Sequence, residues 1–428
     1  MSFKIEKKSS LHGDFIIPGD KSISHRAIML GAIAEGDTVI NHFLEAEDCI
    51  NTIKCFQKLG ISIEENDDKS IVVHGKGLYG LKPSSMALDV GNSGTTIRLL
   101  SGVLAAQNFE SEISGDNSIV RRPMAKIIDP LTMMGANIVS KYNNSCAPLF
   151  ISPSKLHGID YISPIASAQV KSSILFTGLY ADGITTITEP YQSRNHTELI
   201  MSAFNADIMS NYNKTVLSPV EKLSACEITI PGDISSAAYF ITAALITPDS
   251  EITIRNVGMN PTRNGFIDVI LSMGANIEII NAKHGIEPTA DLVVKSSKLS
   301  GVTLEGEIIP RTLDEIPILT VLACFAEGKT IIRDAGELKV KESDRIEVMV
   351  SNLTKMGAHI ETTDDGMIIE GGYPLHGAII GTKYDHRIAM SFAIAALAAE
   401  GKTEIIGSEC VNISYPGFYD DLKRLFQQ

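Results

Sequence analysis

The hydrophobic and polar positions of the chain follow one order of elements that repeats along its length. The run that begins at Pro18 predicts a turn, a polar cluster, a helix of small and apolar residues and a glycine stop. A strand, an amphipathic helix and another strand follow, up to residue 64. The order returns roughly every 70 to 80 residues, with a recurrent Met-Gly-Ala-Asn/His-Ile stop between helix and strand. The pattern therefore predicts six copies of one α/β unit, whose small-residue helices open near residues 21–26, 91–98, 167–173, 232–236, 313–316 and 385–387.

Two Pro-Gly-Asp triplets, at residues 18–20 and 231–233, begin two of these copies. If three copies form one lobe, the chain changes lobes at both triplets. The sequence then predicts one lobe of residues 20–231 and a second, discontinuous lobe of residues 1–19 plus 232–428. Two such crossovers, near Pro18–Asp20 and Pro231–Asp233, would form a hinge.

The polar residues at the helix openings indicate the kind of ligand. The N-terminus of a helix offers unpaired N–H groups and the positive end of the macrodipole, which favour phosphate or carboxylate. If the copies pack in similar orientations, several of these termini face one cleft. The repeat therefore predicts an anionic ligand.

Composition narrows the class of protein further. The chain has 37 basic and 51 acidic residues, a net charge of −14, so we expect no nucleic-acid partner. An anion must then be held by a local group of cations. The six cysteines show no CxxC pair and are expected to be reduced thiols, and no cluster has metal-ligand spacing. We expect no signal peptide and no membrane span, and hence a cytoplasmic protein.

Two charged segments are candidates for chemistry. Asp314 and Glu315 precede a very apolar helix, where they could be N-caps or catalytic carboxylates. If residues 339–345 are helical, Lys341, Glu342 and Arg345 share one face. Because lysines and arginines recur at equivalent places in the copies, we interpret these residues as ligand-binding groups.

These segments resemble the 5-enolpyruvylshikimate-3-phosphate (EPSP) synthase family along essentially the whole chain. The motifs occur in the family's order and spacing: PGDKSISHRA, GNSGTTxR, RRPM, SAQVKS, SRNHTE, PGDISSA, MNPTRxG, DEIPIL, KVKESDR and YDHRIAMSF. The resemblance implies a two-lobed inverse α/β barrel, the enolpyruvyl transferase fold, with six βαβαββ repeats and three repeats per lobe. It also implies transfer of the enolpyruvyl group of phosphoenolpyruvate to the 5-hydroxyl of shikimate 3-phosphate, a step toward chorismate and the aromatic amino acids.

The resemblance also implies a set of site residues. Those that match contacts to shikimate 3-phosphate are Lys21, Ser22, Arg26, Ser167, Ala168, Gln169, Arg194, Asp314 and Lys341. Those that match contacts to phosphoenolpyruvate are Lys21, Gly94, Arg122, Gln169, Arg345 and Arg387. Two departures from some relatives are Ala168, which replaces a serine, and residues 412–416, which lack a lysine; both resemble a second bacterial subgroup.

The implied catalytic residues are Asp314, Glu342 and Lys21. Enolpyruvyl transfer needs carboxyl groups to move protons and cations to hold a phosphate and a carboxylate. The resemblance assigns the 5-hydroxyl proton to Asp314, the methylene proton to Glu342 and the departing phosphate oxygen to Lys21. We expect no metal, no organic cofactor and a monomer whose partners are its two substrates. We also expect inhibition by glyphosate, because family members with alanine in place of Gly94 resist that inhibitor.

Two alternatives compete with this interpretation. The first is the sister enolpyruvyl transferase that acts on UDP-N-acetylglucosamine, which carries a reactive cysteine before its Arg-Pro. Here the corresponding loop has no cysteine between residues 56 and 145. The second is a non-catalytic anion-binding protein built on degenerate repeats, which the retention of both carboxylates and every arginine opposes.

The hinge gives a first prediction. The candidate cations are divided between residues 21–194 and 314–387, so anions that bind both sets favour closed lobes. Saturating shikimate 3-phosphate should therefore reduce the radius of gyration measured by small-angle X-ray scattering. An unchanged radius at saturation would contradict the hinge.

Overall fold

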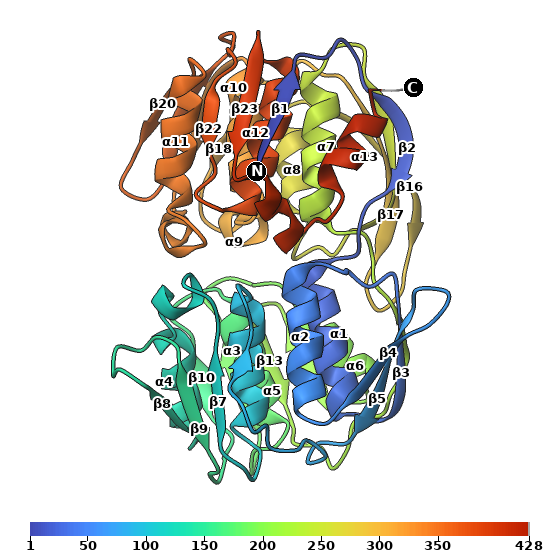
Figure 1. Cartoon of the computed structure of the whole chain (residues 1–428), viewed down its shortest axis with the longest axis vertical. Coiled ribbons are helices and arrows are strands. Elements are labelled where there is room, and N and C mark those ends of the chain that lie inside the picture. Colours follow the sequence, from blue (N-terminus) through green and yellow to red (C-terminus); the bar gives the residue numbers. More distant parts are fainter. Residues whose placement is uncertain (427–428) are drawn as a thin grey trace. The chain divides into compact units, whose positions relative to one another are not determined.

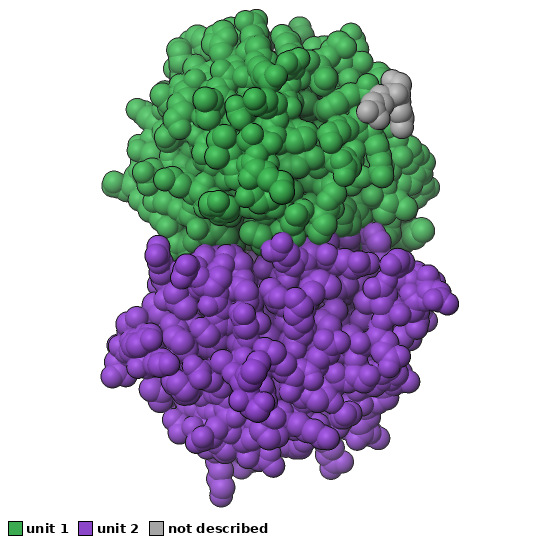
Figure 2. Space-filling view, viewed as in Figure 1, with its two compact units in different colours: residues 1–18, 231–428 green, residues 19–230 purple. Residues whose placement is uncertain are grey.

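The computed structural model describes residues 1–426, and the chain divides into two compact units (Figures 1 and 2). The continuous unit is Gly19–Ile230, and the discontinuous unit joins Met1–Pro18 to Pro231–Gln428. Within each unit, Figure 1 shows strands at the sides and helices between them. The hinge between lobes stays a prediction.

The continuous unit contains three four-stranded sheets, with strand orders β14-β3-β5-β4, β6-β7-β9-β8 and β10-β11-β13-β12. In each sheet the first pair is parallel and the other two pairs are antiparallel. The strands are β3 (Glu35–Asn41), β4 (Ser62–Glu65), β5 (Ile71–Lys76), β6 (Leu88–Asp89), β7 (Ser111–Ser114), β8 (Asn137–Ser140), β9 (Leu149–Ser152), β10 (Asp160–Ile162), β11 (Thr185–Thr188), β12 (Ile208–Asn211), β13 (Lys214–Leu217) and β14 (Glu227–Thr229).

The discontinuous unit repeats this plan in the sheets β16-β17-β15-β2 and β18-β19-β21-β20, and adds the three-stranded sheet β1-β23-β22. Its strands are β1 (Ser2–Glu6), β2 (His12–Ile16), β15 (Glu251–Gly258), β16 (Asn276–Lys283), β17 (Thr289–Lys295), β18 (Thr303–Leu304), β19 (Gly328–Ile332), β20 (His359–Thr362), β21 (Met367–Gly371), β22 (Ile379–Gly381) and β23 (Lys402–Ile406).

Strands from distant parts of the chain complete the sheets of both units. In the continuous unit, β14 comes last in sequence and pairs in parallel with β3, the first strand. In the discontinuous unit, β2 pairs in parallel with β15. Strand β1 pairs antiparallel with β23, at the position where the other sheets have an antiparallel strand from the same copy. The sixth copy is therefore completed by the N-terminal strand.

Each copy contributes one inner helix with nearly every residue buried. Beyond their polar first turns these helices consist mostly of small and apolar residues, which suits helices inside a core. They are α1 (Lys21–Ile33), α3 (Gly94–Leu104) and α5 (Ala168–Gly178) in the continuous unit, and α7 (Ile234–Ile246), α10 (Ile316–Phe325) and α12 (His386–Ala398) in the other.

The remaining helices are shorter or amphipathic. They are α2 (Glu47–Lys58), α4 (Ala125–Met133), α6 (His196–Ala203), α8 (Gly265–Ser272), α9 (Ile308–Thr312), α11 (Arg345–Lys355) and α13 (Phe418–Arg424), with 3-10 turns η1 (Ile119–Arg121), η2 (Gly336–Val340) and η3 (Ser408–Ile413).

Small residues let the inner helices α3 and α5 pack closely and in parallel. Ser173 Oγ donates to Arg98 O at 3.0 Å, and one turn further along both helices Thr177 Oγ1 donates to Gly102 O at 3.2 Å. A side chain at Gly102 would lie 2.5 Å from Ser173 O. Because the contacts advance in the same direction on both helices, their N-termini lie at the same end.

The predicted stops between helix and strand are confirmed. Gly135, Gly274 and Gly357 follow α4, α8 and α11 with φ angles of +93°, +94° and +89°, the left-handed conformation that glycine adopts at little cost. The next residue donates back into the last helical turn, as in Ala136 N to Leu131 O at 2.9 Å. The recurrent motif is thus a helix C-terminal cap.

Candidate active site

The polar openings of the inner helices in the continuous unit are capped by side chains. Asp20, Ser93 and Ser167 accept hydrogen bonds from N–H groups in the first turns of α1, α3 and α5. A single side-chain acceptor satisfies only one or two of the four N–H groups of a helix start. The predicted contacts Ser22 and Ala168 lie in the first turns of α1 and α5.

Two predicted cations at the start of α1 are held by the surrounding helices. Lys21 Nζ lies 3.2 Å from Asp48 Oδ2, and both side chains are largely buried. The buried guanidinium of Arg26 donates to Thr197 Oγ1 at 2.6 Å and to Ser172 Oγ at 2.9 Å. Arg26 therefore joins α1 to the starts of α5 and α6.

Gly94 lies between two guanidinium groups. A Cβ at this position would lie 2.8 Å from Arg98 Nη1 and 3.0 Å from Arg122 Nη1. Arg122 donates to Asn92 Oδ1 and Ser118 Oγ, both at 2.8 Å. The glycine thus leaves room for two cations beside the start of α3.

Arg98 is a site residue that the sequence reasoning did not select. Its Nη1 donates to Gln169 Oε1 at 2.9 Å, and Gln169 Nε2 donates to Thr95 Oγ1 at 3.2 Å. The structure therefore joins Gln169 to the Gly94 segment. The available signal was its place at the end of the GNSGTTIR motif, one helical turn after Gly94.

In the discontinuous unit, Asp314 lies between two arginines, Arg345 from the second helix of its own copy and Arg387 from the next copy. Its carboxylate oxygens are 3.7 Å from Arg345 Nη1 and 3.5 Å from Arg387 Nη2, and Arg387 Nη1 donates to the Asp314 carbonyl at 3.1 Å. Arg345 and Arg387 are 1% and 7% exposed. A carboxylate and two buried cations, contributed by two consecutive copies, therefore meet at the starts of α10, α11 and α12.

Arg345 is held in place by further carboxylates. Its Nη2 donates to Glu342 Oε2 at 2.5 Å, and its Nε donates to Asp385 Oδ2 at 2.8 Å. Burial opposes the charged form, but Asp385 and Glu342 outweigh it and raise the pKa of Arg345. Arg345 Nη1 is buried and makes no hydrogen bond among the described residues, and it faces Asp314 Oδ1 at 3.7 Å.

The prediction that residues 339–345 form one helical face is wrong. Helix α11 begins at Arg345, and Asp344 caps it by accepting from Glu347 N at 3.1 Å. Lys341 lies before the helix, just after η2, where Nζ is 3.4 Å from Glu337 Oε1. The cap explains the difference, because an aspartate with extended backbone is a strong helix start.

The adjacent carboxylates Asp314 and Glu315 separate in the structure. Glu315 is buried and pairs with Arg263, with Nη1 to Oε2 at 2.7 Å, and Ser235 Oγ also donates to Glu315. Glu315 makes no side-chain cap to α10, so the N-cap interpretation is wrong for it. Arg263, from the MNPTR motif, thereby joins the starts of α7 and α10 and leaves Asp314 to Arg345 and Arg387.

The ammonium group of Lys341 is shielded from water and has carboxylates around it. Burial lowers the pKa of Lys341, and the attraction of Glu337, Asp314 and Glu342 only partly opposes it, while Arg345 lowers it further. The charged form is thus disfavoured in the fold. The folded protein therefore loses stability where Lys341 is protonated. This loss is largest below the pKa that Lys341 has in the folded protein and shrinks as pH rises toward the ordinary lysine pKa.

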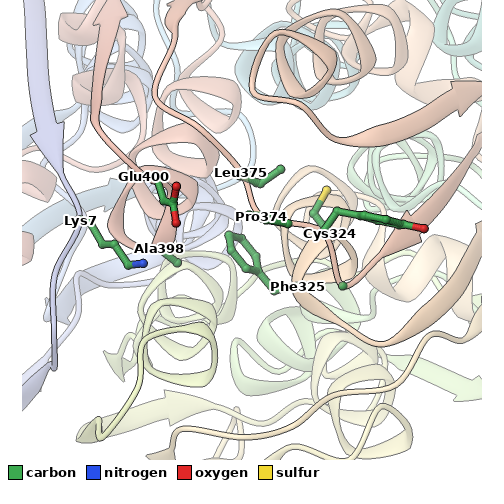
Figure 3. Close-up of a pocket in the computed structure, with 9 residues that line it drawn as sticks. Lys7, Cys324, Phe325, Pro374, Leu375, Ala398 and Glu400 are labelled. Carbon is green, nitrogen blue, oxygen red and sulfur yellow. The ribbon is translucent and has the colours of Figure 1, made fainter.

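The cavity in Figure 3 lies away from these residues. It has a volume of about 330 Å³ and is lined by Lys7, Glu400 and mostly apolar side chains, with Phe325 and Ala398 at its edge. Those two residues end α10 and α12, whereas Asp314 and Arg387 lie at the starts of the same helices. A 13-residue helix is about 20 Å long, so this cavity is separate from the candidate site.

The described residues contain neither a cluster suited to a metal ion nor a helix suited to a membrane. Within residues 1–426, no group of three His, Cys, Asp or Glu side chains is placed to hold a metal ion. In the same part of the chain, no helix is sufficiently long and apolar to cross a membrane.

Comparison with known proteins places the chain in a family. The family described as EPSP synthase (3-phosphoshikimate 1-carboxyvinyltransferase) matches residues 5–422. A 3-phosphoshikimate 1-carboxyvinyltransferase of Thermoanaerobacter sp. (strain X514) is 56% identical over 420 residues, 98% of this chain and 99% of the relative. The relative from Bacillus subtilis (strain 168) is 48% identical over 424 residues and 99% of both chains.

The solved structures agree with the sequence comparisons. An EPSP synthase from Acinetobacter baumannii superposes with a TM-score of 0.88 at 44% identity, over 99% of this chain and 98% of the other. This similarity confirms the predicted fold, which is that of the enolpyruvyl transferases. Within that class, the chain belongs to the EPSP synthase family.

The environment of Lys341 gives a second prediction. Because Glu337 raises the pKa of Lys341, Glu337→Gln should lower it further. The titration can be followed by NMR of lysines dimethylated with ¹³C, with Lys341→Arg to assign the signal. Glu361→Gln, which changes an exposed carboxylate on β20, should leave the titration unchanged. A pKa that stays constant or rises in Glu337→Gln would contradict this account.

Proposed function

We propose that the chain transfers the enolpyruvyl group of phosphoenolpyruvate to the 5-hydroxyl of shikimate 3-phosphate and releases phosphate, in chorismate and aromatic amino acid biosynthesis. The whole-chain similarity to 3-phosphoshikimate 1-carboxyvinyltransferases supports this reaction. The observation that carries it is the placement of Asp314 beside Arg345 and Arg387. This arrangement supplies a proton acceptor and two anion-binding forks at one place.

The substrate contacts are proposals that rest on the family resemblance and on these local geometries. Arg345 and Arg387 present guanidinium groups that match carboxylate and phosphate as bidentate donors. In the other unit, Arg122 and the backbone at Gly94 would also hold phosphoenolpyruvate, with Gln169 and Lys21 shared between ligands. The proposed acceptor contacts are Lys21, Ser22, Arg26, Ser167, Ala168, Gln169, Arg194, Asp314 and Lys341.

The proposed chemistry divides proton transfer between two carboxyl groups. Asp314 accepts the proton of the 5-hydroxyl as its oxygen attacks C2 of phosphoenolpyruvate, and neighbouring guanidinium groups favour the ionised form that can accept it. Glu342 acts as the acid: it gives a proton to the methylene carbon and takes one back from the methyl group as phosphate leaves. The proton that Asp314 accepted passes to the departing phosphate. Lys21 stabilises the departing phosphate oxygen.

The rival acceptor, UDP-N-acetylglucosamine, is not favoured. That reaction was expected to need a cysteine in the loop before Arg122, and the loop has none. The curated relatives also carry the 3-phosphoshikimate name rather than the rival's. Phosphate release with phosphoenolpyruvate and each acceptor in turn tests the function: we expect release with shikimate 3-phosphate and none with UDP-N-acetylglucosamine, and the reverse would refute the proposal.

We also propose that the enzyme works in the cytoplasm as a monomer and requires no metal or organic cofactor. The reaction transfers the enolpyruvyl group and releases phosphate with no change of oxidation state, so the carboxylates and cations above supply its chemistry. Sedimentation tests the monomer, and activity after exhaustive chelation tests the independence from metal.

The carboxylate assignments give a third prediction. Asp314→Asn and Glu342→Gln should each reduce kcat by about two to four orders of magnitude, the usual effect of removing an acid or base. Both variants should stay folded and bind shikimate 3-phosphate, which calorimetry can measure. Glu361→Gln serves as the matched control and should keep parental turnover. Near-parental turnover in either variant would show that its carboxylate has another role.

Gly94 gives a fourth prediction, on inhibition by glyphosate. In Gly94→Ala the new methyl group must displace the tips of Arg98 and Arg122, which are flexible enough for the fold to persist. The KM for phosphoenolpyruvate should rise. Glyphosate is longer and should lose about 1–3 kcal/mol more binding free energy, the usual effect of overpacking a tight site.

A matched control exists at Gly381, where an added Cβ would contact nothing within 4 Å. Gly381→Ala should leave both constants unchanged. Inhibition constants for glyphosate and KM values for phosphoenolpyruvate decide the matter. Equal losses for the two ligands in Gly94→Ala would mean that Gly94 does not discriminate between them.

A further inference from the structure

A buried charged cluster in the continuous unit has no role in the mechanism above. It consists of Lys171 on α5, Glu189 after β11 and Glu198 on α6, each at most 5% exposed. Lys171 Nζ lies 3.0 Å from Glu189 Oε2 and 2.8 Å from Glu198 Oε1. Burial would lower the pKa of Lys171, but the two carboxylates outweigh it and raise the pKa, so Lys171 keeps its charge.

Glu189 differs from Glu198 in what else it contacts. Its Oε1 accepts from Ser167 N at 2.9 Å, and its Oε2 accepts from Ser193 Oγ at 2.8 Å and from Ser193 N at 3.4 Å. One carboxylate thus connects two segments that are 26 positions apart in sequence, Ser167 and Ser193. Its own backbone is fixed by Asn213, whose Nδ2 donates to Glu189 O and whose O accepts from Glu189 N at 2.8 Å.

Both connected segments carry proposed contacts to shikimate 3-phosphate. Ser167 is itself a proposed contact and caps α5, and Arg194 directly follows Ser193. Lys171 Nζ also donates to Ser193 O at 3.4 Å, so the ion pair holds this loop from two sides. Hydrogen bonds to a buried carboxylate are among the strongest available in a fold.

We propose that Glu189 is a positioning residue that holds the Ser167 and Ser193–Arg194 segments at the separation required to bind the phosphate of the acceptor. The inference rests on the proposed function, since it names the same acceptor. Glu189 does not touch the substrate; it acts through the two segments. Lys171 lies 3.0 Å from this carboxylate and supplies the opposite charge inside the fold.

Glu189→Gln tests the proposal, because the amide places N–H groups against the donors of Ser167 or Ser193. The dissociation constant of shikimate 3-phosphate, measured by calorimetry without phosphoenolpyruvate, should rise about ten- to a hundredfold. The KM for shikimate 3-phosphate should rise by a similar factor. In contrast, kcat and the KM for phosphoenolpyruvate should stay within about threefold of the parent.

Glu198→Gln is the matched control. It removes the other carboxylate from Lys171, and the contacts of Glu198 in the described residues are with Lys171 and Thr215. Its melting temperature should fall about as much as that of Glu189→Gln, but its affinity for shikimate 3-phosphate should stay within about threefold of the parent. Ser193→Ala, which removes one hydroxyl contact and no charge, should weaken the acceptor about three- to tenfold.

The outcomes separate this inference from the proposed function. If the parent binds shikimate 3-phosphate but Glu189→Gln and Ser193→Ala bind it equally well, positioning by Glu189 is refuted and the function stands. Equal weakening in Glu198→Gln would also refute it, since it would show a general effect of the buried charges. A parent that binds no shikimate 3-phosphate would refute the function and this inference together.

Discussion

The parallel packing of inner helices brings like charges together, and the site depends on this constraint. Parallel helices place the positive ends of their macrodipoles at one end, and the chain adds cations there, such as Arg26, Arg98 and Lys21. Repulsion among these groups must be offset in the folded protein. Carboxylates do so locally, as Asp48 does for Lys21, and an anionic substrate can add to that compensation when it binds.

The same balance explains how an acidic protein can bind anions. The net charge is −14, but the carboxylates nearest the site are already engaged with arginines. Arg345 is shared by Glu342, Asp385 and Asp314, and Arg263 is held by Glu315. Arginine suits these places because it stays charged when buried and offers several donors. The pairing of neighbouring carboxylates with arginines, rather than the net charge of the chain, therefore decides which charged ligands the site favours.

Much of the fold and part of the site followed from the sequence. The pattern that repeats six times along the chain predicted the inner helices and the glycine stops, since both depend on local chemistry. Sequence could not show that Glu315 pairs with Arg263, or that Arg98 contacts Gln169, because those pairs lie far apart along the chain. The wrong prediction of a helical face that includes Lys341 has a local cause. The capping aspartate at 344 starts the helix at a later residue than the charge pattern suggested.

The strand β1 has a consequence for the order of events during synthesis. It pairs with β23, whose residues 402–406 leave the ribosome about 400 residues after those of β1. The strand β2 must also wait, for β15 at residues 251–258. The continuous unit, by contrast, contains every strand of its own sheets once residue 229 has emerged. Because domains generally fold as units during translation, residues 19–230 can fold first, while β1 remains without its sheet partner until residues 402–406 have emerged.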